Sequence, residues 1–181
     1  WVGGIDYNNF KYDQVYQGAR QVGSAFKPYV YATAIDQKHY TPCTQIPDTK
    51  TCIEAGKWGN AKEWCPRNTN GSFSGKMLTL KSALANSINS VTAKLMDEVG
   101  PATVIDLIKK LGINTKDIPS LPSICLGSAD ITLLEMVGAY GAFANEGNYL
   151  QPTFITRIED KNGHIIYQHT AEARNAISPE N

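Results

Sequence analysis

Two residues near the start of the chain, Ser24 and Lys27, have the types and the spacing of a nucleophile and its base. A serine hydroxyl attacks a carbonyl carbon only when a neighbouring group removes its proton, and a neutral lysine amine can do so. On a helix, a side chain three positions later lies on the same face, so the amine of Lys27 would point back toward Ser24. Such a lysine must be partly buried, because burial lowers its pKa and favours the neutral amine.

The spacing by itself does not identify a catalytic serine. At ordinary Ser and Lys usage, a chain of this length contains about one such pair by chance. A serine at the start of a helix is also a common N-cap, with no chemical role. The pair therefore indicates a catalytic site only when the neighbouring residues and a second motif support it.

A second candidate group is Ser87 with Asn89, in a segment that breaks a helical pattern. A hydroxyl there could pass a proton between Lys27 and a reacting amine, while the Asn89 amide could bind a peptide carbonyl and hold the lysine. Both residue types also favour helix ends, where they cap backbone groups. Taken alone, this segment is better explained as a helix cap.

The elements that must position these residues are helices. Apolar residues recur at helical spacing over residues 24–38, and Pro28 falls in the first turn, where it costs no intrahelical hydrogen bond. Residues 78–86 and 91–99 form two further predicted helices on either side of the Ser87 break. A fourth predicted helix starts at Pro101 and ends at Gly112, a suitable C-terminal cap.

The second half of the chain mixes a helix with strands. Thr132 and Glu135 have the spacing of a capping box, which predicts a helix from there to Gly147. Residues 153–159 and 164–168 form a predicted hairpin around an Asn-Gly turn. Residues 1–5 are a short apolar run that resembles the end of a strand. The expected fold class is α+β, a helical cluster with part of an antiparallel sheet.

Three of the four cysteines lie in the polar segment between residues 39 and 76. If Trp58 and Gly59 form the tip of a hairpin, Cys52 faces Cys65 at a distance that a disulfide can bridge. Cys43 with Cys52 is the competing pair. A zinc site with His39 is disfavoured because the sequence lacks a closely spaced cysteine pair, so no metal or other cofactor is expected. Cys125 lies between apolar residues and is expected to be a buried thiol.

Composition argues against polyanionic partners and membrane spans. The 181 residues carry 17 Lys plus Arg and 17 Asp plus Glu, without a basic cluster, so no nucleic-acid partner is expected. The apolar runs fall short of the roughly 20 residues that cross a bilayer. Any anchor or targeting segment is therefore expected upstream of Trp1.

Longer strings around these motifs resemble one family, the class A, bifunctional penicillin-binding proteins of bacterial cell-wall synthesis. Residues 20–28 resemble its R-Q-P-G-S-x-F-K-P segment, with Val22 in place of the proline. Residues 64–68 are similar to its W-x-P-x-N element, and residues 80–89 to the segment that carries S-x-N. The other matching stretches, in order, are residues 2–7, 126–128, 134–136 and 144–147.

The resemblance implies a peptidoglycan D,D-transpeptidase of the penicillin-binding and serine β-lactamase-like fold. Ser24 would be acylated by D-alanyl-D-alanine stem peptides or by β-lactam antibiotics, with Lys27 as base. Ser87 would relay protons, and Asn89 would contact the substrate and the lysine. The protein would act at the periplasmic face of the inner membrane, within a possible cell-wall synthesis complex. A β-lactamase, a β-lactam sensor and a non-catalytic scaffold are the alternatives.

The family's third motif, Lys-Thr-Gly or Lys-Ser-Gly, does not occur in the 181 residues. We therefore expect the chain to be the N-terminal and central part, residues 1–181, of one transpeptidase domain. A glycosyltransferase domain would lie upstream and further sheet strands downstream. Without the third motif, these residues alone are expected to be nearly inactive.

Overall fold

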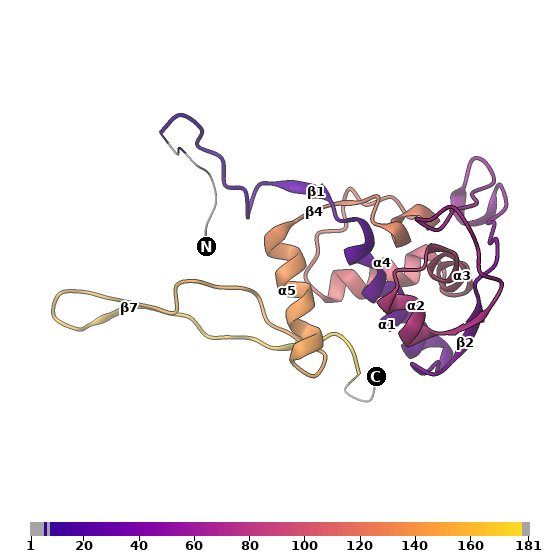
Figure 1. Cartoon of the computed structure of the whole chain (residues 1–181). Coiled ribbons are helices and arrows are strands. Elements are labelled where there is room, and N and C mark those ends of the chain that lie inside the picture. The colour runs from indigo at the N-terminus through magenta and orange to yellow at the C-terminus, as the bar shows by residue number, and fades with distance from the viewer. Residues whose placement is uncertain (1–5, 7, 179–181) are drawn as a thin grey trace.

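The computed structural model describes residue 6 and residues 8–178, so the strand end predicted at residues 1–5 lies outside the described part. A cluster of helices forms the body, and a hairpin extends away from it (Figure 1). The helices are α1 (Lys27–Lys38), α2 (Leu80–Ala85), α3 (Asn89–Val99), α4 (Pro101–Lys110) and α5 (Leu133–Ala144), with short 3-10 helices η1 (Gly23–Phe26), η2 (Lys57–Gly59) and η3 (Pro122–Leu126). None of the described helices is long and apolar enough to cross a bilayer.

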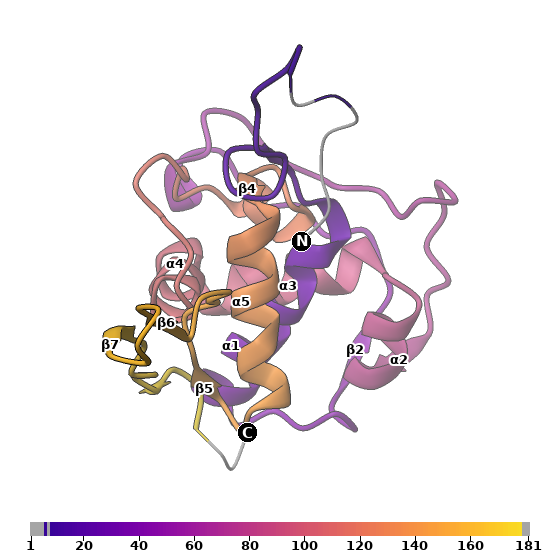
Figure 2. The ribbon, with the colours of Figure 1, turned by 90° about the vertical axis from the view of Figure 1, so that its left-hand side faces the viewer.

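Helix α1 forms the centre of the core. Its residues Tyr29 and Val30, together with Phe26 just before it, are fully buried. Helix α5 lies along one side of α1 (Figure 2), and the ring of Tyr29 contacts those of Tyr140 and Phe143 at centroid distances of 5.8 and 5.9 Å. Burying rings of this size contributes strongly to stability. The helix that follows Ser24 is therefore rigidly held.

The break predicted around Ser87 separates α2 from α3. Thr79 caps α2 by accepting a hydrogen bond from the Ser82 amide. Ser87 then adopts the left-handed region, at φ +54°, so the chain turns sharply before α3 begins at Asn89. Left-handed backbone is uncommon for residues with a Cβ atom. The turn projects Ser87 away from the helical ladder, toward α1.

The strands form antiparallel pairs of two within the described residues: β1 (Ala19–Gln21) with β4 (Asp130–Thr132), β2 (Gln45–Pro47) with β3 (Met77–Thr79), β5 (Asn148–Tyr149) with β8 (Arg174–Asn175), and β6 (Arg157–Glu159) with β7 (Ile165–Gln168). The predicted class, α+β with helices and part of an antiparallel sheet, is confirmed. The pair β1–β4 matters most for the site, because β1 leads directly into η1 and Ser24.

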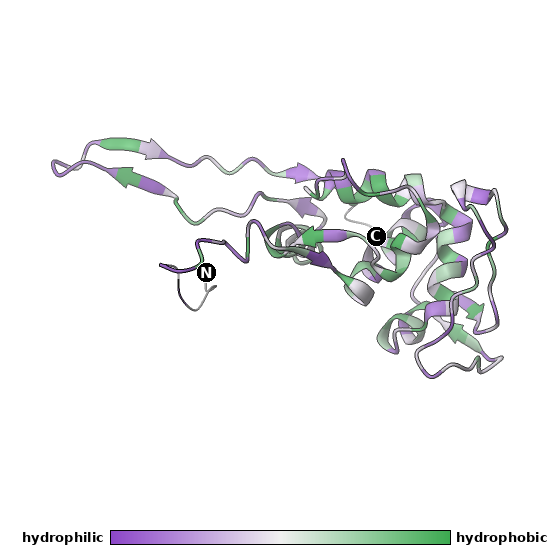
Figure 3. Ribbon diagram, turned by 90° about the horizontal axis from the view of Figure 1, so that it is seen from above, coloured by the Kyte–Doolittle hydropathy of each residue, from purple (hydrophilic) through white to green (hydrophobic). Residues whose placement is uncertain are grey.

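Two local predictions in the second half are confirmed. Thr132 and Glu135 form the capping box of α5, in which each side chain accepts from the other residue's backbone amide. Strands β6 and β7 form the hairpin around the Asn-Gly turn, and it reaches away from the helical body (Figure 3). Helix α5 ends at Ala144 rather than Gly147, because Glu146 and Gly147 adopt positive φ values of +50° and +79°.

A disulfide joins Cys52 and Cys65 and closes a loop with a sequence separation of 13. Ile53 pairs with Trp64 as an antiparallel bridge just inside it, and the tip is the 3-10 turn η2 rather than a tight hairpin turn. Cys43 is an exposed free thiol and Cys125 a buried one. The loop also packs on α3, since the Trp58 indole N–H donates to Asp97 at 3.0 Å.

Replacing Cys52 and Cys65 together with serine should lower the free energy of unfolding by about 3 kcal/mol, because the open loop restores chain entropy to the unfolded state. Urea denaturation measures this change. Cys43→Ser is the matched control and should leave the midpoint unchanged, since that thiol is exposed and unpaired. Equal stabilities for the double variant and the control would contradict the role of the disulfide.

Candidate active site

The amine of Lys27 lies at the centre of the candidate site and is buried, with 1% of the residue exposed. Its Nζ donates three hydrogen bonds, to the Ser87 carbonyl oxygen at 2.7 Å, to Ser87 Oγ at 2.9 Å and to Asn89 Oδ1 at 2.6 Å. Three acceptors match the three protons of an ammonium group. The turn between α2 and α3 therefore forms the binding site of the Lys27 amine.

The same burial makes the Lys27 amine a usable base. Desolvation lowers the pKa of Lys27 from 10.5 to about 8, and a weaker electrostatic contribution from the buried Cys125 thiol opposes the shift. With a pKa of about 8, about one amine in ten is neutral at pH 7, against fewer than about one in a thousand for an ordinary lysine. The site holds the charged form yet releases its proton readily.

Ser87 connects the amine to the candidate nucleophile. Ser87 Oγ accepts from Lys27 and donates to Ser24 Oγ at 3.1 Å, so a chain of hydrogen bonds runs from Ser24 to Lys27. The sequence predicted that Lys27 would point toward Ser24 itself. In the structure, Lys27 and Ser24 are linked by two hydrogen bonds that share Ser87 Oγ. Ser24 is exposed, so a substrate can reach its hydroxyl.

Asn89 is held on both sides of its amide. Its Oδ1 accepts from Lys27, and its Nδ2 donates to the Arg67 carbonyl oxygen at 2.8 Å. Asn68 Oδ1 accepts from the backbone amides of Asn89 and Ser90 at 3.0 and 3.1 Å, which caps the first turn of α3. The 64–68 element is thus part of the site's support, a role that its sequence did not reveal.

The backbone around Ser24 depends on a close glycine contact. Gly23 adopts a φ of +56°, and its amide donates to the Gly127 carbonyl oxygen at 3.2 Å. A Cβ atom on Gly127 would lie 2.0 Å from the Gly23 carbonyl oxygen, so only glycine fits there. The Tyr140 hydroxyl donates to the Ala25 carbonyl oxygen at 2.7 Å, which ties α5 to the same turn.

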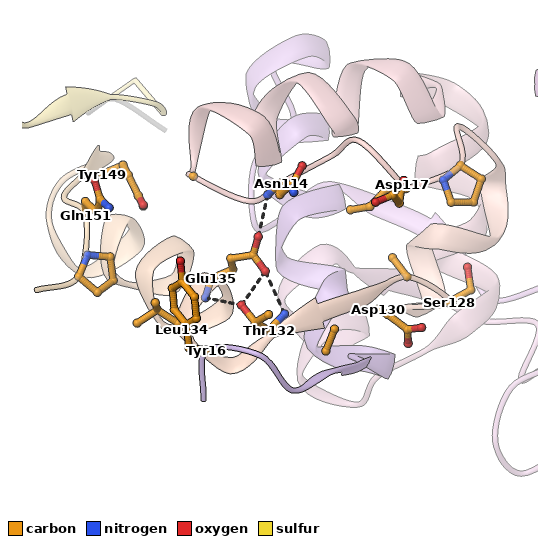
Figure 4. Close-up of a pocket in the computed structure, with 16 residues that line it drawn as sticks. Tyr16, Asn114, Asp117, Ser128, Asp130, Thr132, Leu134, Glu135, Tyr149 and Gln151 are labelled. Carbon is orange, nitrogen blue, oxygen red and sulfur yellow. Dashed lines mark hydrogen bonds between the residues drawn. The ribbon is translucent and has the colours of Figure 1, made fainter. Parts of the chain in front are cut away.

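A hollow of about 640 Å³ lies elsewhere, beside β4 and the start of α5 (Figure 4). Tyr16, Asn114 and Asp130 are among its lining residues, but none of Ser24, Lys27, Ser87 or Asn89 is. Its carboxylate Glu135 is already engaged by Thr132 and by the Asn114 amide at 2.9 Å. The hollow is therefore separate from the site formed by Ser24 and Lys27.

Comparison with known proteins assigns the class. A family model described as the penicillin binding protein transpeptidase domain matches residues 4–181. The chain therefore belongs to this family, and the resemblance seen in its motifs is confirmed.

The relatives in this family include penicillin-binding protein 2D of Bacillus subtilis, 35% identical over 97% of this chain, and penicillin-binding protein 1A of Rickettsia prowazekii, 36% identical over 92%. The chain covers 25% and 21% of those two proteins, so it spans about a quarter or less of their length.

Solved structures agree with this assignment. Penicillin-binding protein 1A from Haemophilus influenzae superposes with a TM-score of 0.84 over 96% of this chain and 25% of that one, at 27% identity. Penicillin-binding protein A from Mycobacterium tuberculosis, in its penicillin G acyl-enzyme complex, shares the fold with a TM-score of 0.72 at 18% identity, over 90% of this chain and 41% of that one.

The Lys27 side chain should titrate near pH 8 because its amine is desolvated. Carbon-13 NMR of the lysine side chains, with Lys27→Arg used to assign the Lys27 signal, measures the midpoint. A Lys27 midpoint near the ordinary value of 10.5 would contradict a buried amine in this site.

Proposed function

We propose that this chain carries the acylation centre of a peptidoglycan D,D-transpeptidase, with Ser24 as nucleophile and Lys27 as base. The observation that supports the proposal is the unbroken set of hydrogen bonds from Ser24 through Ser87 to the buried Lys27. Membership of the transpeptidase family supplies the reaction class. The substrate would be the D-alanyl-D-alanine end of a peptidoglycan stem peptide.

In the acylation step, Ser24 Oγ attacks the carbonyl carbon of the D-alanyl-D-alanine bond. The serine proton passes to Ser87 Oγ, whose own proton passes to the neutral amine of Lys27. As the carbon–nitrogen bond breaks, the proton returns by the same path to the leaving D-alanine amine. A second stem amine then attacks the ester, gives up its proton to this path and restores the Ser24 hydroxyl, which leaves a cross-linked peptide.

Asn89 would have two functions in this scheme. Its Oδ1 holds Lys27, and the second proton of its Nδ2 can donate to a substrate carbonyl. β-Lactams would acylate Ser24 because they present a strained amide at the position of the scissile bond. The penicillin G acyl-enzyme complex of penicillin-binding protein A from Mycobacterium tuberculosis supports this reaction, because that protein has the same fold.

The proposed setting follows from the substrate. Stem peptides lie outside the cytoplasmic membrane, so the domain would work at the periplasmic face of the inner membrane, where a cell-wall synthesis complex could include it. An oxidising compartment agrees with the Cys52–Cys65 disulfide.

Replacing Ser24 with alanine in the complete protein should abolish covalent labelling by a fluorescent penicillin, because the change removes the hydroxyl that Ser87 links to Lys27. Gel fluorescence measures the label. Ser123→Ala is the matched control, since Ser123 also lies in a 3-10 helix but bonds only to Ser128 among the contacts described. Persistent labelling of the Ser24→Ala protein would refute the assignment of Ser24 as the nucleophile.

We also propose that residues 1–181 alone acylate poorly. The Lys-Thr-Gly motif that the family places on the opposite wall of the cleft does not occur in them. Loss of one oxyanion-hole donor slows acyl transfer by about two to three orders of magnitude. Penicillin acylation of the 181-residue polypeptide at a rate equal to that of the complete protein would contradict this expectation. Acylation of the complete protein by penicillin without any cross-linking of stem peptides would instead favour a β-lactam sensor.

A further inference from the structure

A buried carboxylate lies behind the site, and the mechanism above does not use it. Asp48 follows β2 and is only 3% exposed. Its Oδ1 accepts from Ser90 Oγ at 2.6 Å and from Asn68 Nδ2 at 2.8 Å, and its Oδ2 accepts from the Ser74 amide at 2.8 Å. A buried carboxylate is costly unless such donors surround it. Several polar groups of the fold therefore hold Asp48 in place.

Asp48 stays ionised. Burial by itself would raise its pKa, but the hydrogen bonds from Ser90, Ser74 and Asn68 outweigh that effect and lower the pKa to about 2. A permanent negative charge accepts hydrogen bonds more strongly than a neutral amide or hydroxyl oxygen does. The donors around Asp48 are consequently fixed in orientation.

The most important of these donors is Asn68. Because Asn68 Nδ2 donates to Asp48 and to the Ser72 carbonyl oxygen at 3.0 Å, its Oδ1 must face the other way. That oxygen accepts from the amides of Asn89 and Ser90. Asp48 thus determines which end of the Asn68 amide meets the first turn of α3.

The same turn holds Lys27. Asn89 places its Oδ1 2.6 Å from Lys27 Nζ, and its backbone follows the turn that contains Ser87. A hydrogen-bonded path therefore leads from Asp48 through Asn68 and Asn89 to the amine. This path connects Asp48, which follows β2, to Lys27, which begins α1.

We propose that Asp48 is a positioning residue for acylation: it orients Asn68 so that Asn89 and Ser87 hold the Lys27 amine in line with Ser24. The inference rests on the proposed function of Ser24 and Lys27. Asp48 touches no reacting atom. Its effect is on geometry, and a misplacement of about 1 Å at a reacting group can cost about a hundredfold in rate.

The change Asp48→Asn isolates this role. The backbone bonds of residue 48, from its amide to the Lys76 carbonyl oxygen and from the Gly75 amide to its own carbonyl oxygen, both 2.9 Å, do not involve the carboxylate. An asparagine of the same size keeps them. However, its amide group would turn a donor toward Asn68, Ser90 or Ser74, all of which donate to Asp48.

The experiment is stopped-flow acylation of the complete protein by a fluorescent penicillin. It yields the dissociation constant of the non-covalent complex, the first-order rate constant of acylation and the amplitude, which counts folded sites. Asp48→Asn should lower the rate constant by about a hundredfold with the dissociation constant little changed. A purely structural role would lower the amplitude and leave the rate constant of the folded fraction unchanged, which would overturn the proposal.

Asp160→Asn is the matched control. Asp160 also has a lowered pKa and accepts two backbone hydrogen bonds, from Asn162 at 2.7 Å and His164 at 2.8 Å, but it lies in the hairpin of β6 and β7. The Asp160→Asn protein should be acylated with the rate constant of the unmodified protein. A loss there equal to that of Asp48→Asn would overturn the proposal, because the effect would not depend on the site.

Ser90→Ala keeps the test decisive if Asp48→Asn fails to fold. It removes one hydrogen bond from the Asp48 carboxylate and leaves the carboxylate itself in place. We expect a smaller fall in the rate constant, and an unmodified rate constant would overturn the proposal. If the unmodified protein is not acylated at all, the proposed function fails, and the positioning role fails with it. If it is acylated and Asp48→Asn acylates equally fast, only the positioning role fails.

Discussion

The burial of one charged group, the Lys27 amine, constrains the rest of the site. An ammonium group removed from water needs acceptors at close range, and the turn between α2 and α3 supplies three of them. Those acceptors exist only because Ser87 takes a left-handed backbone conformation and Asn89 starts a new helix. The packing of α1 against α3 brings the lysine to that turn.

Two opposing demands meet at this amine. Desolvation lowers its pKa from 10.5 to about 8, which favours the neutral amine that a base requires, and the electrostatic contribution of the buried Cys125 thiol opposes this shift. The three acceptors fix the position of the amine. Ser87 lies between the amine and Ser24, so the proposed proton transfer would depend on the same turn that holds the charged amine. The hydrogen bond from Lys27 to Ser87 Oγ therefore both positions the amine and forms part of the proposed path for the proton.

Sequence patterns predicted the elements that are defined locally. The helix after Ser24, the break at Ser87 and the capping box of Thr132 and Glu135 follow from spacing and cap preferences over a few residues. The facing of Cys52 and Cys65 required one further assumption about the tip of the loop. The proposed role of Asp48 was not predictable, because its partner Ser90 is 42 residues away and no local pattern records that contact. Likewise, the link from Lys27 to Ser24 through Ser87 spans about 60 residues in each step and appears only in three dimensions.

Localisation of the penicillin adduct tests the central claim, that the buried lysine activates Ser24, most directly. Tandem mass spectrometry of the tryptic peptide spanning residues 21–38, from the complete protein at saturating penicillin, identifies the modified side chain. The account predicts that the whole mass of the penicillin is added to Ser24, because ring opening releases no fragment, and that Lys27→Ala protein lacks the adduct. An adduct on any other residue, or an unchanged Ser24 adduct in Lys27→Ala protein, would contradict it.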